Sequence, residues 1–174
     1  SSYGISKVSN KKFNEALKEA KNYSTEVIIE KSFNGPEYTV ALLKGKPLTP
    51  LQILHDPIRG FYDYEAKYNS QNTQKIKIED ESIVKRLKEI SEKVFDCLNC
   101  KTWARVDFVS EGEKLAVIEI NSVPGFTAKS LFPLAAKYSG IEYKELISLI
   151  IEDFEISVSY TQHRAHDTET TLVW

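Results

Sequence analysis

Two carboxylates, a guanidinium and a carboxamide lie in two apolar segments on either side of Gly112, and they are the side chains best placed to do chemistry. Apolar and polar residues alternate in residues 102–109 and 115–121, which predicts two strands of one antiparallel hairpin. We expect the loop between them to consist of residues 112–114. A loop of that length fixes which residues face each other across the two strands.

The predicted register places Asp107 opposite Glu119 and Arg105 opposite Asn121. Two opposed carboxylates in an otherwise apolar hairpin repel each other, so the arrangement is reasonable if a cation lies between them. Two carboxylates and the amide oxygen of Asn121 form an all-oxygen ligand set, which suits Mg²⁺ or Mn²⁺ and argues against zinc. The alternative is a solvated face on which Arg105 neutralises one carboxylate, and the spacing alone does not decide between the two.

Two further segments could bind an anion through the backbone. Pro124 and Gly125 impose a tight turn directly after the hairpin, where N–H groups could point at an anion. Residues 1–4 are small residues shortly before a predicted helix, which by themselves are a weak indication of a phosphate-binding loop.

Hydrophobic periodicity predicts the elements that must position these residues. A capping Asp80 and a stripe of apolar residues indicate the longest helix. Residues 55–79 follow neither pattern, and a connector of that length is typical of a functional lid or a disordered loop, so Lys75 and Lys77 are expected to be solvated loop lysines. The helices are expected over residues 10–22, 80–98, 133–140 and 143–154, the strands over residues 27–29, 38–43, 48–54, 102–109 and 115–121, and a patternless tail over residues 155–174.

Composition excludes several functional classes. The chain has 23 Lys and Arg against 25 Asp and Glu, a net charge of −2, so no basic surface indicates binding to nucleic acid or to an anionic membrane. No apolar run approaches a membrane span and no secretory signal is visible, so we expect a cytoplasmic protein. Cys97 and Cys100 have the spacing of half a zinc site, but no second cysteine pair exists and we expect them to be structural or incidental.

Several separated segments together resemble D-alanine-D-alanine ligase, an enzyme family with the ATP-grasp fold. The resemblance runs in order from residue 1 to about residue 154. It implies an α+β fold with a mixed, mostly antiparallel sheet flanked by helices and truncated at the N-terminus. It also implies a remnant of the small ATP-grasp subdomain in residues 1–36, a catalytic subdomain in residues 37–154 and a tail in residues 155–174. The segments that carry the resemblance are 1–8, 29–31, 34–40, 61–68, 103–107, 119–125 and 130–131.

The resemblance implies which residues bind ATP and its metals. Glu30, Lys31 and Phe33 match the positions that hold adenine, and Glu37 matches the carboxylate that accepts hydrogen bonds from the ribose hydroxyls. The two carboxylates and the amide of the hairpin resemble the ligands of two Mg²⁺ or Mn²⁺ ions that bridge the ATP phosphates. They are Asp107, Glu119 and Asn121.

It also implies catalytic roles. Lys67 resembles the lid lysine that reaches the transferred phosphate, within a loop that closes over the site. Arg105 and the Gly125 backbone N–H resemble the pair that stabilises developing negative charge. Tyr68 after the lid lysine is typical of the dipeptide-forming members. Ser1 and Tyr68 match residues that a glutamate of the family's N-terminal domain contacts.

The implied reaction is the ATP-dependent joining of two D-alanine molecules through an acyl phosphate, for peptidoglycan. Ser130 and Leu131 match the positions that hold the carboxylate of the second D-alanine. The family's N-terminal half is missing, so we expect a C-terminal portion that is inactive alone and forms part of a homodimer when intact. The alternatives are a non-catalytic nucleotide-binding or assembly module, and another ATP-grasp carboxylate-amine ligase.

Overall fold

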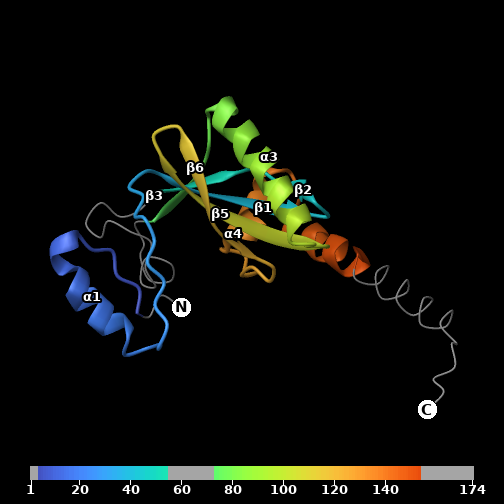
Figure 1. Cartoon of the computed structure of the whole chain (residues 1–174). Coiled ribbons are helices and arrows are strands. Elements are labelled where there is room, and N and C mark those ends of the chain that lie inside the picture. The colour runs from blue at the N-terminus through green and yellow to red at the C-terminus, as the bar shows by residue number, and fades with distance from the viewer. Residues whose placement is uncertain (1–3, 55–72, 154–174) are drawn as a thin grey trace, which may run out of the picture.

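The structure is a computed structural model that describes residues 4–54 and 73–153, and its centre is one sheet (Figure 1). The expected α+β class with a mostly antiparallel sheet is confirmed, and every strand pair among the described residues is antiparallel. The strands lie in the order β4 (Gln74–Lys77), β3 (Leu51–Leu54), β1 (Glu37–Leu43), β5 (Trp103–Glu111) and β6 (Lys114–Asn121), and the short β2 (Lys46–Pro47) pairs with β1.

Strand β1 is the central strand, and both of its faces are buried. Successive side chains of a strand point to opposite faces, so its residues enter two different apolar clusters. One cluster lies against α3 (Glu81–Cys97) and contains Val40, Leu42 and Phe108. The other lies against α4 (Leu131–Tyr138) and the helical residues 143–153, and contains Ala41 and Leu43. The sheet is therefore the middle layer between helices on its two sides.

Strands β5 and β6 form the predicted hairpin, but its turn is shorter than predicted. Glu111 pairs with Lys114, so two residues rather than the expected 112–114 make the turn. Gly112 has a φ of +59°, the left-handed conformation that short hairpin turns require and glycine adopts without strain.

A register shift between Asp107 and Phe108 separates the turn from the polar end of the hairpin. Phe108 pairs with Val117 and Asp107 pairs with Glu119, so Ile118 is an extra, unpaired residue of β6. Such a bulge bends the strand and changes the pairing by one residue. The bulge compensates for the shorter turn, and the predicted pairing at the polar end is therefore confirmed.

Residues 4–36 contain one short helix and no strand. A 3-10 turn, η1 (Asn10–Lys12), leads into α1 (Phe13–Ala20), which confirms the predicted helix with narrower bounds. The predicted strand 27–29 is wrong, because these residues have no regular structure and the side chains of Ile28 and Ile29 are 85% and 65% exposed. A strand needs a neighbouring strand to satisfy its backbone and a core to cover its side chains, and the described residues supply neither to this segment.

The remaining elements follow their capping and turn residues. Asp80 caps α3 as predicted, its Oδ1 accepting hydrogen bonds from the backbone N–H of Ser82 at 2.8 Å and of Ile83 at 3.2 Å. Strand β3 begins at Leu51, later than expected, directly after Pro50, which has no N–H to donate to a sheet. Strand β4 was not predicted and lies within the stretch that we expected to be a loop.

Three expectations concern the chain as a whole. Within residues 4–54 and 73–153, no helix is both long enough and apolar enough to cross a membrane. The subdomain boundary expected at residues 36 and 37 stays a prediction. The expected tail, residues 155–174, lies outside the described residues.

Candidate active site

The candidate site lies on the face of the sheet that also carries α4. Cross-strand neighbours share a face, and Thr39 pairs with Asp107 while Ala41 pairs with Arg105. Along this face the strands change from apolar residues beneath α4 to polar ones. The polar part therefore lies at the end of a well-packed core, where strands rather than loops fix its backbone.

Asp107 is the centre of a hydrogen-bonded network. Arg105 donates hydrogen bonds to both carboxylate oxygens, from Nε to Oδ1 at 2.8 Å and from a terminal nitrogen to Oδ2 at 2.6 Å. The Thr39 hydroxyl donates to Oδ1 at 2.6 Å. The side chains of Arg105 and Asp107 are 16% and 17% exposed, so this pair is largely withdrawn from water. A two-point guanidinium contact fixes the orientation of the carboxylate as well as compensating its charge.

Asn121 connects the two carboxylates of the hairpin. Its Nδ2 donates to Asp107 Oδ2 at 3.1 Å and to Glu119 Oε1 at 3.3 Å. The predicted juxtaposition of Asp107, Glu119 and Asn121 is thus present, and the amide nitrogen lies between the two negative groups. Neutralisation of one carboxylate by Arg105, the alternative expectation, is also observed for Asp107.

The residues fit a hard divalent cation. No group of three or more His, Cys, Asp or Glu residues suited to a metal occurs in the described parts of the chain, so such a site needs the amide as a ligand. Turning the Asn121 amide about its last bond exchanges nitrogen for oxygen and gives an all-oxygen donor set. Oxygen donors of this kind suit Mg²⁺ or Mn²⁺.

Lys75 joins this face from β4, and here the expectation was wrong. It is half-buried in a strand rather than a solvated lysine of a loop, and it pairs with the buried Ile53 of β3. Burial, and then the positive charge of Arg105, lower the pKa of the Lys75 ammonium. Residues 75–78 do alternate between lysine and isoleucine, a period-two signal that was too short to stand out in a polar stretch.

Thr39 is a second residue that sequence reasoning missed. It is buried, and its hydroxyl donates a hydrogen bond to Asp107. A polar residue within an otherwise apolar strand was the available signal, because a buried hydroxyl needs a partner.

The turn that follows β6 is compact around Ser130. Ser130 Oγ accepts from the Thr127 backbone N–H at 3.1 Å and lies 2.8 Å from the Thr127 hydroxyl. A Cβ on Gly125 would lie 3.3 Å from Ser130 Oγ, so glycine allows the close approach of these two residues. The side chain of Leu131 is buried in the core cluster, so only its backbone can face a ligand.

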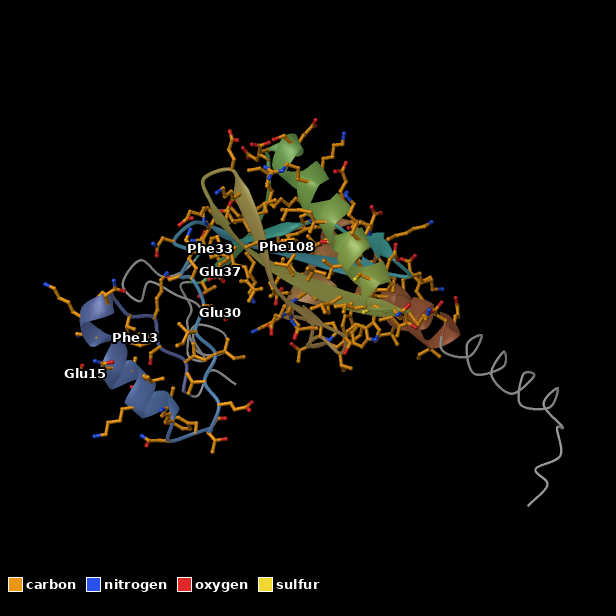
Figure 2. All side chains as sticks on the ribbon, viewed as in Figure 1. Phe13, Glu15, Glu30, Phe33, Glu37 and Phe108 are labelled. Atoms are coloured by element: carbon orange, nitrogen blue, oxygen red, sulfur yellow. The ribbon has the colours of Figure 1, made fainter. Side chains whose placement is uncertain are left out.

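The residues expected at adenine and ribose lie on the stretch that leads from α1 to the sheet. Figure 2 labels Glu30, Phe33 and Glu37 along it. Glu30 is exposed, while the Lys31 ammonium forms an ion pair with Glu111 and lies 5.2 Å from the centre of the Phe33 ring. Glu37 begins β1, two residues from Thr39 and on the same face.

Three predicted site residues and most of the predicted lid lie outside the described residues. The three are Ser1, Lys67 and Tyr68. Cys97 and Cys100 are both free thiols. Cys97 is exposed and Cys100 packs against the cluster under α3, and the structural or incidental role expected of them stays a prediction.

Sequence comparison decides the family. The sequence model of the family described as "D-ala D-ala ligase C-terminus" matches residues 1–152. The chain belongs to this family. A D-alanine--D-alanine ligase from Vesicomyosocius okutanii is 43% identical over 157 residues, which cover 88% of the chain and 53% of that protein. One from Aquifex aeolicus is 39% identical over 145 residues, 79% of the chain and 49% of that protein.

Solved structures agree with the ATP-grasp fold of these ligases. A D-alanine--D-alanine ligase from Bacillus anthracis complexed with ATP superposes with a TM-score of 0.73 at 28% identity, over 88% of the chain and 49% of that structure. The VanG D-Ala:D-Ser ligase from Enterococcus faecalis gives 0.73 at 28% identity, over 87% and 46%. The chain therefore spans about half the length of the relatives that it matches.

Proposed function

We propose that this chain is the C-terminal catalytic part of an ATP-dependent D-alanine–D-alanine ligase of cell wall synthesis. The observation that supports the proposal most directly is the pairing of Asp107 with Glu119, bridged by Asn121, in a chain of this ligase family. Two carboxylates and an amide at the end of a rigid hairpin form an oxygen-donor set that suits a nucleotide-bound Mg²⁺. ATP is the proposed cofactor, and two D-alanine molecules are the proposed substrates.

The proposed reaction begins with transfer of the γ-phosphoryl group of ATP to the carboxylate of one D-alanine. The amine of the second D-alanine then attacks the acyl phosphate, and inorganic phosphate leaves. Two Mg²⁺ or Mn²⁺ ions, held by Asp107, Glu119 and Asn121, would neutralise phosphate charge when bound. In such transfers the protein contributes mainly by positioning and by electrostatic stabilisation.

Arg105 and the turn after β6 supply the groups that stabilise negative charge. The Arg105 guanidinium is held by Asp107 in a largely buried position, so its orientation is fixed before any ligand arrives. A fixed cation and the Gly125 N–H, aimed at developing charge, lower a barrier without reorganising during the reaction. Lys67 is the proposed third positive group, and Ser130 and the Leu131 backbone are the proposed holders of the second carboxylate.

We also infer that residues 4–36 pack against an N-terminal region of such a ligase. None of these residues is buried, although the segment carries several exposed apolar side chains. Apolar side chains gathered at this density mark a surface that another surface covers and shields from water. The exposed set is Ile5, Val8, Phe13, Tyr23, Ile28 and Ile29.

Calorimetric titration of ATP into the chain, with Mg²⁺ or with EDTA, tests the nucleotide site. We expect binding that is tighter with Mg²⁺ and that is weakened about tenfold or more by Glu119→Gln, which removes one charge while keeping the shape of the side chain. Glu119 is exposed, so this variant should fold normally. Asp107→Ala should weaken binding further, because it also releases Arg105.

Glu92→Ala is the matched control, since Glu92 is an exposed carboxylate on α3, on the other side of the sheet. It should leave ATP binding unchanged. Binding that is equally strong in EDTA, or that survives Glu119→Gln, would contradict the proposed metal site. No binding at millimolar ATP by a folded chain would show that the nucleotide site is not complete in these residues.

A further inference from the structure

Lys75 reaches from one edge of the sheet to the turn that precedes α4. It lies on β4, the last strand on that side, and its Nζ donates to the backbone carbonyl of Lys129 at 3.3 Å. The two residues are separated by 54 positions in the sequence. The contact therefore ties two distant parts of the chain across the face that carries Arg105.

The carbonyl that Lys75 contacts belongs to the peptide group between Lys129 and Ser130. The other end of that peptide, the Ser130 N–H, donates to the Thr127 carbonyl at 2.8 Å. The peptide is thus held at both ends, by Lys75 on one side and by Thr127 on the other. Because a peptide group is planar, fixing its two ends fixes the direction in which Ser130 leaves it.

The surroundings of Lys75 differ from those of an ordinary surface lysine. It is half-buried, and Arg105 places a second positive charge near it. Within residues 4–54 and 73–153, no carboxylate forms an ion pair with it. Lys77, two residues further along β4, lies on the same face, but its Nζ is 4.8 Å from the centre of the Tyr138 ring on α4. The two lysines of β4 therefore have different partners, and only Lys75 contacts the Ser130 turn.

We propose that Lys75 is a positioning residue that holds the Ser130 peptide, through the Lys129 carbonyl, in the orientation needed to bind a substrate carboxylate. The inference rests on the proposed function, in which Ser130 and the Leu131 backbone hold the second amino acid. Lys75 itself touches no substrate in this role. Its ammonium acts through the turn, and its positive charge also favours an anionic group on the same side of the sheet.

Amide hydrogen exchange and amide chemical shifts of the ¹⁵N-labelled chain test the positioning. Lys75→Met keeps the apolar stem and removes the donor, so we expect the Ser130 amide to exchange about tenfold faster, with shift changes confined to residues 127–131. Lys75→Arg keeps a donor and a charge and should restore most of the protection. Lys77→Met, on the same strand and face, should leave the Ser130 amide unchanged.

Titration with D-alanine, followed at the Ser130 and Leu131 amides, separates the two proposals. If the amide signals of the wild-type chain shift on addition of D-alanine, Lys75→Met should raise the Kd for D-alanine about tenfold, while Lys75→Arg raises it less. If the wild-type chain does not respond but Lys75→Met still accelerates Ser130 exchange, the positioning stands and the binding role of Ser130 in this chain fails. Unchanged Ser130 exchange in Lys75→Met, at an unchanged Tm, overturns the positioning.

Discussion

Apolar side chains have different surroundings in residues 4–36 and in the second region, the described residues 37–54 and 73–153. Both regions are rich in isoleucine, valine and phenylalanine. In the second region many of these side chains fill two clusters, one on each face of the sheet. In the first region none is buried, and Figure 1 shows α1 standing apart from the sheet. Apolar residues make a core only when two surfaces that carry them face each other, and residues 4–36 have one such surface.

The two regions meet at the end of β5. The Gly35 N–H donates to the Ser110 carbonyl at 3.0 Å, and the Ser110 N–H donates to the Pro36 carbonyl at 2.9 Å. The ion pair between Lys31 and Glu111 adds a second link one residue further along. The first region is therefore attached to the sheet through backbone hydrogen bonds and charge rather than through apolar packing.

The largest expected effect is on the free energy of unfolding, and it comes from replacing one phenylalanine in each region. Phe108 is fully buried in the cluster under α3, and Phe108→Ala should lower the free energy of unfolding by about 3–5 kcal/mol through lost burial and a residual cavity. Phe13→Ala on α1 should change it by no more than about 0.5 kcal/mol, because Phe13 lies outside any core cluster. Urea denaturation of both variants measures the difference, and equal losses would contradict it.

An intermediate effect is expected at the junction of the two regions. A Cβ on Gly35 would lie 2.2 Å from the backbone oxygen of Ser110, closer than any real contact allows. Gly35→Ala should therefore break the hydrogen bond to Ser110 and lower the free energy of unfolding by about 1–3 kcal/mol. Thermal unfolding gives the cost, and the amide shift of Ser110 reports the broken contact.

Gly112→Ala is the control for that experiment. A Cβ on Gly112 would meet no atom within 4 Å, and its cost of about 1 kcal/mol comes from the left-handed backbone alone. It should leave the Ser110–Gly35 hydrogen bond in place. If Gly35→Ala keeps the wild-type Ser110 shift, the junction adapts and the two regions are less tightly joined than the structure indicates.

The smallest effect concerns the cap of α3. Hydrogen bonds from the Ser82 side chain, and then from the backbone N–H of Ile83 and Ser82, hold the pKa of Asp80 below its ordinary value. A carboxyl whose pKa is lower in the folded state stabilises the fold above its unfolded pKa and loses this contribution as the pH falls through the folded value.

Asp80→Ala should thus lower the Tm modestly at pH 7, and its difference from the wild type should shrink as the pH drops below about 4. Asp96→Ala, an exposed carboxylate near the other end of α3, should show no comparable difference at pH 7. A deficit of Asp80→Ala that is the same at pH 7 and pH 3 would show that the cap does not act through its charge.

The sequence by itself determined most of the local elements and much of the polar end of the hairpin. Asp80 predicted the start of α3, and alternation predicted both strands of the hairpin and the facing of Asp107 and Glu119. These features depend on neighbours within a few residues or on one short turn, which sequence patterns report well. The family followed from the same segments, because their residues and order are specific.

The tertiary structure alone decided which segments found partners. The apolar run 27–29 is no strand because no described strand pairs with it, whereas the polar residues 74–77 became β4 because β3 accepts their hydrogen bonds. It also brought Thr39, Lys75 and the Ser130 turn to the face of Arg105. Contacts across so many residues depend on the sheet order, and a strand's own sequence does not carry the identity of its neighbours.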